Sequence, residues 1–199
     1  WIGPGYQRAT LQDVLNMNVR NAYDEDYSNP GTTAFLHEAA TGGRLPEGPE
    51  QDNKGFLATI GLASGAPDTA NPTGQCLYKS ANTDVLAAVV EARGGRTLGL
   101  WLADLADASG VEGALHITTD RTGFPSFSGG ICLTARDLCR YGALFARGGL
   151  GVAVDLDRRQ PPARAGMAHM PNPQAQAGHG QCRGFFHDVA LQHRRVGTT

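Results

Sequence analysis

Residues 78–95 read YKSANTDVLAAVVEARGG, and this stretch carries the clearest helix signal in the chain. Gly94 and Gly95 stand at its end, and glycine commonly ends a helix. The sequence therefore predicts an amphipathic helix that follows the polar residues 78–84. Four apolar residues recur at helical spacing and would share its buried face: Val85, Leu86, Val89 and Val90.

Three polar side chains alternate just before this helix: Tyr78, Ser80 and Asn82. Alternate residues of an extended segment point to the same side, so a phenol, a hydroxyl and an amide would face one cleft. Lys79 lies next to Tyr78, and an ammonium beside a phenol helps it to lose its proton and act as a general base. A structural alternative stays open, in which Ser80 or Asn82 caps the helix and Tyr78 packs against the core.

Capping patterns predict two further helices. Thr10 and Asp13 stand three residues apart, which is the capping-box arrangement, and predict a helix over about 10–18. Thr134 and Asp137 repeat this spacing and open a second capped helix, which Gly148 and Gly149 would end. Its inward residues would be Leu138, Tyr141, Gly142 and Phe145.

The remaining segments are less regular. Apolar spacing predicts a helix over about 97–108, and residues 115–119 predict a short strand in which His116 would be a core or strand histidine. Residues 23–35 and 41–53 are rich in turn-forming residues, so we expect surface loops there. In the first loop, the acidic run at 24–26 is typical of a solvated face rather than a cation site.

Composition and charge limit the class of protein. The chain has 199 residues, of which 41% are hydrophobic and 18% charged, and this excludes a coiled coil, a collagen-like chain and a strongly charged disordered chain. The net charge of -2 argues against nucleic acid as a partner. No apolar run approaches 18 residues, so we expect no membrane span.

The composition changes near residue 150. Residues 1–150 carry a net charge of -5 and residues 151–199 carry +3, with four of the six histidines. We expect 1–150 to form the folded domain and 151–199 to be an Arg-, Pro-, Gln- and His-rich tail that is disordered or frameshifted. Four tail residues are of types that bind zinc, namely His179, Cys182, His187 and His193. Their spacing fits no common zinc finger, so we expect no metal site.

The cysteines and the first residue say little about compartment. The four cysteines, which form no Cys-x-x-Cys pair, are Cys76, Cys132, Cys139 and Cys182. We expect them to be reduced and mostly buried thiols. Reduced thiols slightly favour the cytoplasm as the compartment. The chain begins at Trp1 without a recognisable leader, so targeting cannot be read from it.

Common signatures of nucleophilic catalysis are missing from the 199 residues. No Gly-x-Ser-x-Gly elbow and no phosphate-binding Gly-Lys-Ser/Thr loop occur. The chain has two lysines, Lys54 and Lys79, and the residues three positions before them are Gln51 and Cys76. The chain therefore contains no Ser-x-x-Lys, which would place a serine and its activating amine on one helical face.

Several stretches together resemble the 6-aminohexanoate-dimer hydrolases, a group within the serine β-lactamase and penicillin-binding-protein superfamily. Residues 78–86 resemble that group's Tyr-x-Ser-x-Asn-Thr-Asp-Val-Leu box, and 11–17 with 23–27 resemble its Leu-x-x-Val-Leu-Asp-Met and Tyr-x-Glu-Asp-Tyr segments. Residues 117–124, 129–130 and 134–138 resemble the segments that follow. Order and spacing agree over about residues 8–150.

The resemblance implies an α/β (α+β) fold, mainly the helical subdomain with an incomplete antiparallel sheet. It implies a serine hydrolase that cleaves the amide or ester bond of a small molecule through an acyl-enzyme and needs no cofactor. Tyr78 would be the proton-transfer residue, with Ser80, Asn82 and Lys79 in support. The substrate-binding residues would be Tyr27, Glu38 and Ser128.

Two features depart from the group. Its Ser-x-x-Lys pair should lie before Trp1, so we expect the chain alone to be inactive. The resemblance also implies that the central sheet is incomplete, which would leave helix faces uncovered, so we expect marginal stability. Its late Lys-Thr-Gly-like or Gly-x-His-Gly box has only a faint counterpart at 177–181, and the tail from about Gly151 matches nothing in the group. A non-catalytic binding or remnant protein of the same fold is the alternative that these features leave open.

Overall fold

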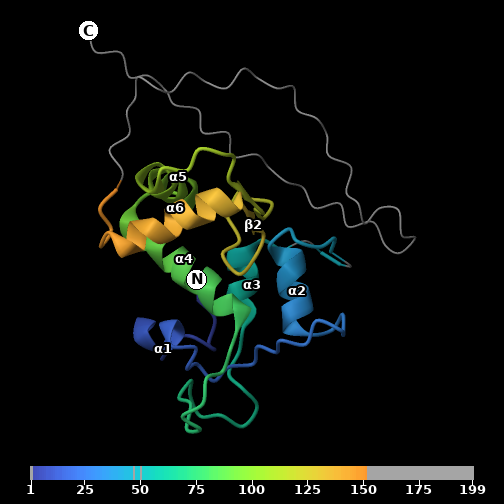
Figure 1. Ribbon diagram of the computed structural model, residues 1–199. Helices are drawn as coiled ribbons and strands as arrows, with labels where there is room; N and C mark the ends of the chain where they lie inside the picture. Colours follow the sequence, from blue (N-terminus) through green and yellow to red (C-terminus); the bar gives the residue numbers. More distant parts are fainter. Residues whose placement is uncertain (1, 47, 50, 152–199) are drawn as a thin grey trace.

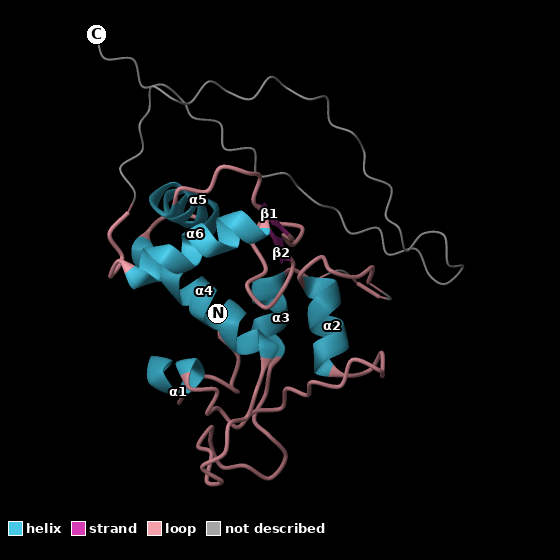
Figure 2. Cartoon of the chain, viewed as in Figure 1, coloured by secondary structure: helices cyan, strands magenta, loops and turns pink. Residues whose placement is uncertain are grey.

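The computed structural model describes residues 2–46, 48–49 and 51–151, and these residues are mainly helical (Figure 2). A small antiparallel sheet pairs His116 with Cys132 and Ile117 with Ile131. This composition agrees with the predicted mixed α/β class. The elements in chain order are α1 (Leu11–Leu15), α2 (Thr33–Ala40), α3 (Asn53–Thr59), α4 (Ser80–Gly94), α5 (Leu98–Ser109), β1 (His116–Ile117), β2 (Ile131–Cys132) and α6 (Ala135–Ala146).

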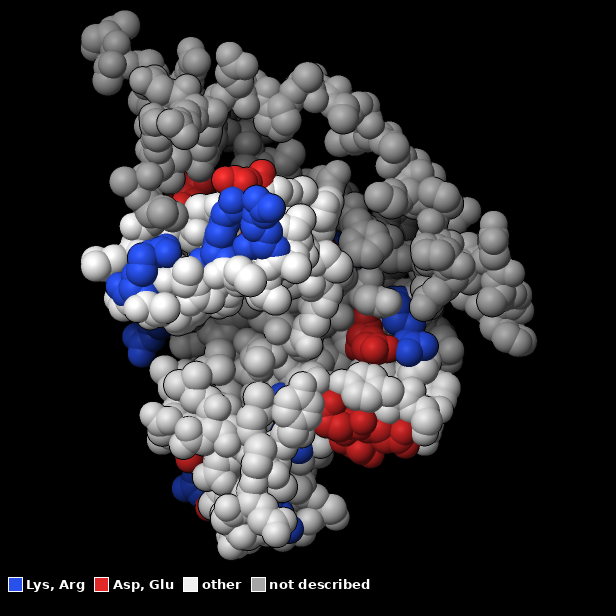
Figure 3. All heavy atoms as spheres, viewed as in Figure 1, with Lys and Arg blue, Asp and Glu red and all other residues white. Residues whose placement is uncertain are grey.

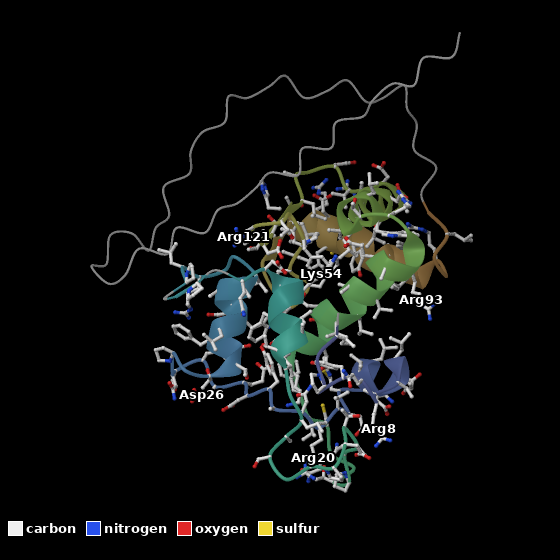
Figure 4. All side chains as sticks on the ribbon, turned by 180° about the vertical axis from the view of Figure 1, so that it is seen from behind. Arg8, Arg20, Asp26, Lys54, Arg93 and Arg121 are labelled. Atoms are coloured by element: carbon white, nitrogen blue, oxygen red, sulfur yellow. The ribbon has the colours of Figure 1, made fainter. Side chains whose placement is uncertain are left out.

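Helix α4 lies at the centre of the arrangement (Figure 1). It packs against α1, α3 and α5, while α2 packs on α3 and α6 on α5. On the surface side of α3, Lys54 pairs with Glu91 of α4 and lies 4.8 Å from the ring centroid of Phe124 (Figure 4). Helix α4 therefore connects the N-terminal helices with the β1–β2 and α6 region.

The main core lies where α1, α3 and the first turns of α4 meet. Burying a large apolar side chain contributes about 1.5–3 kcal/mol, so this cluster is the main source of stability. A smaller cluster joins Ala88 of α4 to Leu98 of α5 and to Phe124. The larger side chains of the main core are Tyr6, Val14, Val19, Tyr23, Phe56, Leu57, Ile60 and Val85.

Most predicted helix ends are confirmed, but α1 ends at Leu15 rather than near residue 18, and α4 begins at Ser80 rather than after the polar residues 78–84. Thr10 and Asp13 form a capping box at α1, and Thr134 accepts a hydrogen bond from the Asp137 backbone N–H at 3.1 Å. Gly95 ends α4 with a φ of 63°, a left-handed conformation that glycine adopts without steric cost. Helix α5 and strand β1 also lie where the sequence predicted them.

The predicted buried face is wrong in part for α4 and largely wrong for α6. In α4 Val85 is buried and Leu86 packs against the core as predicted, whereas Val90 is exposed, and Ala81 and Ala88 complete the buried stripe. In α6 Leu144 is buried, whereas Leu138 is 57% and Phe145 is 64% exposed. Several elements approach α4 from different sides, and apolar spacing alone does not say which side each neighbour covers.

Two short helices were not predicted. Helix α2 begins within the last three residues of the predicted 23–35 loop, and α3 begins at the last residue of the predicted 41–53 loop; the rest of each helix follows the loop. Each is capped by a side chain, since Thr32 accepts from Phe35 N–H and Asp52 from Gly55 N–H. Both helices are eight residues or shorter, so they offer little periodicity to recognise.

Three cysteines and one histidine differ from expectation. Cys76, Cys132 and Cys139 are exposed rather than buried, and Cys182 lies outside the described residues. His116 lies in a strand as predicted, but it is exposed and not in the core. The predicted tail, residues 151–199, lies almost entirely outside the described residues. Among the described residues, no helix is long and apolar enough to span a bilayer.

Candidate functional site

A pocket of about 140 Å³ opens between α2, the start of α4 and the loop before β2. Four of the seven residues predicted for the site line it, although they come from four segments of the chain: Tyr27, Glu38, Ser80 and Ser128. Other lining residues are Tyr23, His37, Ser126 and Gly130. The tertiary structure thus joins positions that lie up to a hundred residues apart.

Glu25 ties the Tyr27 loop to the first residue of α4. Its carboxylate accepts hydrogen bonds from the Ser80 backbone N–H and, at 3.2 Å, from the Ser80 hydroxyl. It also accepts from the Tyr27 hydroxyl at 2.6 Å, and the Tyr27 and Ser80 oxygens are 2.9 Å apart. Lys79 provides no side-chain cap for α4, so Glu25 supplies the missing acceptor from another segment, where the helix dipole also favours a carboxylate.

The expectation of a solvated acidic run is therefore wrong for Glu25. It holds for Asp24 and Asp26, which are exposed, and Figure 4 places Asp26 at the outer edge of the molecule. Acidic side chains gather on this side of the surface, below α2 (Figure 3). The middle residue of the run turns inward and joins the pocket network.

Tyr27 keeps its phenolic hydrogen at neutral pH. The pKa of Tyr27 is raised to about 12, mainly by burial and also by the hydrogen bond to Glu25, while the bond to Ser80 lowers it. Its hydroxyl therefore keeps its hydrogen, which it donates to Glu25. The Tyr78 phenol makes a smaller contribution that also raises the Tyr27 pKa.

Tyr78 and Lys79 are neighbours in sequence but occupy opposite environments. Tyr78 is 61% exposed, so it does not pack against the core as the structural alternative proposed. Lys79 is buried, and its ammonium donates to the Tyr23 carbonyl at 2.7 Å. Burial lowers the Lys79 pKa, while the charges of Glu25 and Asp24 partly offset that effect.

Asn82 does not face the pocket. It is fully buried, accepts from the Tyr6 hydroxyl at 2.8 Å, and donates to the Val14 carbonyl at 3.3 Å. The prediction that residues 78, 80 and 82 share one side is wrong, because α4 already begins at Ser80. Two residues along a helix are rotated by about 200°, which turns Asn82 away from Ser80 and towards α1.

Glu38 forms an ion pair with Arg44. Its Oε2 accepts from Arg44 Nε at 2.9 Å and Nη2 at 2.6 Å, and the Arg44 guanidinium lies 3.9 Å from the ring centroid of Phe35. Both charged side chains are partly exposed, at 32% and 39%. Part of the negative charge that Glu38 brings to the pocket is therefore neutralised.

Ser128 is held by a carboxylate that sequence reasoning did not assign to the site. Its hydroxyl donates to Asp84 Oδ2 at 2.9 Å, and its backbone N–H donates to Asp84 Oδ1 at 3.0 Å. Next to it, Gly130 has a φ of 82°, and a Cβ there would lie 2.4 Å from Thr118 Oγ1. This wall of the pocket is therefore closely packed at Gly130 and held in position by the Asp84 carboxylate.

His37 forms the opposite side of the same network. Its Nε2 lies 3.0 Å from Asp84 Oδ2 and 3.2 Å from Asn53 Oδ1, so this nitrogen carries a hydrogen. Its Nδ1 lies 2.9 Å from the Tyr23 hydroxyl, and its ring stacks on Phe56 at 5.0 Å. Burial raises the pKa of Tyr23, which keeps that hydroxyl protonated.

Sequence reasoning therefore missed Glu25, His37 and Asp84 as individual site residues. Glu25 and Asp84 lay within quoted motif stretches, so their position in those motifs was a usable signal. His37 carried no comparable signal, because it is a lone histidine outside the quoted motif stretches.

The described residues contain no group of three histidine, cysteine or acidic side chains that could hold a metal ion. The zinc-ligand candidates of the tail, His179, Cys182, His187 and His193, all lie outside those residues. The carboxylates of the pocket instead accept hydrogen bonds from protein groups.

No family model matches the chain. The chain is 35% identical over 153 residues to the 6-aminohexanoate-dimer hydrolase of Paenarthrobacter ureafaciens. The matched segment covers 74% of this chain and 36% of that protein, so the chain spans about a third of the length of its curated relative. This similarity supports the predicted relationship to β-lactamase-fold hydrolases.

Proposed function

We propose that the chain is part of a serine hydrolase that cleaves an amide or ester bond of a small molecule, and that the pocket binds this substrate. One observation carries the proposal: Tyr27, Glu38, Ser80 and Ser128, the positions inferred from family resemblance, line one pocket. The similarity to a 6-aminohexanoate-dimer hydrolase supports the same reaction class.

In the proposed reaction a serine oxygen attacks the substrate carbonyl carbon and forms an acyl-enzyme while the amine or alcohol leaves. Tyr78 transfers the proton to the leaving group, and water then releases the acid. The serine belongs to a Ser-x-x-Lys pair, which these 199 residues do not contain. We therefore propose that the pair is encoded outside them.

The other residues have binding or supporting roles. Tyr27 donates its only phenolic hydrogen to Glu25 and offers an oxygen acceptor, Glu38 supplies negative charge, and Ser128 offers a polar group on the opposite wall. Ser80 supports Tyr78 from the start of α4, and Lys79 supports it only indirectly, by anchoring this segment to the Tyr23 carbonyl. Asn82 supports it indirectly, because its hydrogen bonds anchor the first turn of α4 to α1 and Tyr6.

The decisive experiment uses the protein from the complete reading frame. Nitrocefin, a p-nitrophenyl ester and the 6-aminohexanoate dimer are tested as substrates of the wild type, Tyr78→Phe and Tyr141→Phe. Loss of proton transfer should lower turnover by roughly 10²- to 10⁴-fold in Tyr78→Phe, while Tyr141→Phe on α6 retains it. Equal turnover of both variants would contradict the role of Tyr78.

The 199-residue chain should show no turnover in the same assays. Turnover by this chain that Tyr78→Phe abolishes would show that the nucleophile lies within it, and the proposal of an external Ser-x-x-Lys pair would be wrong.

A second candidate is a non-catalytic binding or remnant protein of the same fold. It is favoured by the missing Ser-x-x-Lys, since Gln51 and Cys76 occupy the positions three before the two lysines. The full reading frame distinguishes the candidates. A serine in the expected motif roughly one hundred residues before Tyr78, a spacing that the resemblance implies, favours the enzyme, and alanine or glycine there favours the binding protein.

A further inference from the structure

The carboxylate of Asp84 is fully buried and joins three parts of the pocket wall. Oδ1 accepts from the backbone N–H groups of Phe127 at 2.6 Å and Ser128 at 3.0 Å. Oδ2 accepts from Asn53 Nδ2 at 3.0 Å and from the Ser128 hydroxyl at 2.9 Å, and it lies 3.0 Å from His37 Nε2. Five donors thus converge on one buried charge.

This arrangement fixes the direction of the Ser128 hydroxyl. An ionised carboxylate only accepts hydrogen bonds, so Ser128 must donate its single hydroxyl hydrogen to Asp84. Ser126 Oγ lies 3.1 Å from Ser128 Oγ, but a charged acceptor is stronger than a neutral hydroxyl. Ser126 is therefore the donor in that second contact.

The hydroxyl of Ser128 then has no hydrogen for the pocket, and one oxygen lone pair remains after the bond from Ser126. A ligand group that bears a hydrogen can bond to it, whereas a ligand oxygen would face another oxygen. The N–H of a secondary amide and the bridging oxygen of an ester differ in this respect, although the two groups have nearly the same shape.

We propose that Asp84 is a positioning residue that makes Ser128 an acceptor for the substrate N–H, so that the pocket selects secondary amides over esters. This inference rests on the proposed function and narrows its substrate class. Asp84 does not line the pocket, so it acts through Ser128. His37 and Asn53 hold the carboxylate from the side of α2 and α3.

The test compares N-butylacetamide with butyl acetate, which differ by NH against O at one position. Each is titrated into the 199-residue chain, and the backbone amide signals of Ser80, Ser128 and Gly130 are followed by NMR. One hydrogen bond predicts that the amide binds about three- to tenfold more tightly than the ester.

Two variants separate positioning from structure. Ser128→Ala removes the acceptor and should bring the two affinities together. In Asp84→Asn the side-chain amide donates to Ser128, which turns the hydroxyl hydrogen towards the pocket and should shift the preference to the ester. Thr59→Ala, which removes an exposed hydroxyl of α3, is the matched control and should keep the wild-type preference.

If Asp84→Asn fails to fold, Ser128→Ala still decides the question. Equal binding of both ligands by the wild type, or an unchanged amide preference in Ser128→Ala, would overturn the inference and leave the proposed function intact. If neither ligand shifts the signals of the wild type, the proposed substrate pocket is wrong, and the inference is overturned with it.

Discussion

Tyr6 donates its phenolic hydrogen to the side-chain oxygen of Asn82 at 2.8 Å, which joins the N-terminal segment to α4 inside the core. Both residues are buried, and burial raises the pKa of Tyr6. In Tyr6→Phe the Asn82 oxygen loses its partner away from water, so we expect a loss of about 1–3 kcal/mol in the free energy of unfolding. Urea unfolding followed by circular dichroism measures it.

Tyr141→Phe is the control for that loss. Tyr141 lies on α6 with its ring against Phe145, and its replacement should change the free energy of unfolding by less than about 0.5 kcal/mol. Equal stability of the wild type and Tyr6→Phe would show that the bond between Tyr6 and Asn82 makes no net contribution.

Glu25→Gln should lower the pKa of Tyr27 from about 12 towards its usual value near 10. The variant removes a negative charge, and its neutral amide oxygen is a weaker acceptor for the phenolic hydrogen than the carboxylate. Burial is the largest cause of the raised pKa and remains, so the pKa should not return fully to 10. An NMR titration of the labelled tyrosine rings measures this change.

Glu38→Gln supplies the comparison, because Glu38 is not among the groups that raise the Tyr27 pKa. Its Tyr27 titration should match that of the wild type. A Tyr27 pKa that does not move in Glu25→Gln would mean that Glu25 does not set the state of this phenol.

Arg44→Gln should strengthen the binding of an amine-ended ligand such as n-hexylamine. Arg44 occupies the Glu38 carboxylate that would otherwise attract the ammonium. The pair is partly exposed and therefore worth about 0–1 kcal/mol, so the gain should not exceed roughly fivefold. NMR titration at low salt measures the affinity.

Arg96→Gln is the matched control for this variant, since Arg96 forms an ion pair of the same kind with Asp104 on α5. It should leave n-hexylamine binding unchanged. If the affinity for the amine falls or stays the same in Arg44→Gln, Arg44 does not compete for Glu38.

Asp137 should contribute acid-dependent stability. Hydrogen bonds from the Glu112 backbone N–H, Thr134 and Arg140 lower the pKa of Asp137 to about 2 from a usual 3.8. As pH falls from about 4 to about 2, the unfolded chain takes up this proton first, so the stability that Asp137 provides at neutral pH is lost. Asp137→Asn should flatten this part of the curve of unfolding free energy against pH.

Urea unfolding between pH 2 and 7 measures this dependence. Asp104→Asn, which alters a more exposed carboxylate of α5, should keep the wild-type curve. Identical curves for the wild type and Asp137→Asn would show that these hydrogen bonds do not favour the ionised form.

Much of the helical framework could be predicted because caps are local. Thr10 with Asp13, Thr134 with Asp137, and Gly95 each mark a helix end through contacts within four residues. Helices α2 and α3 were missed because they are short, and a short helix is held mainly by packing against its neighbours.

The candidate site could be predicted only in part. Tyr27, Glu38, Ser80 and Ser128 were named from motif positions, and the fold brings them to one pocket. The geometry around residues 78–82 was not predictable, because the identity of these residues does not say whether they are extended or helical.

The sequence by itself determined at least one end of α1, α4, α5 and α6 and which residues belong to the motif stretches, because those signals act between neighbours along the chain. Only the tertiary structure decided that Asn82 turns to Tyr6 and that Asp84 binds Ser128 and His37. These contacts join residues more than forty positions apart, and a buried polar group takes whichever partner packing places beside it.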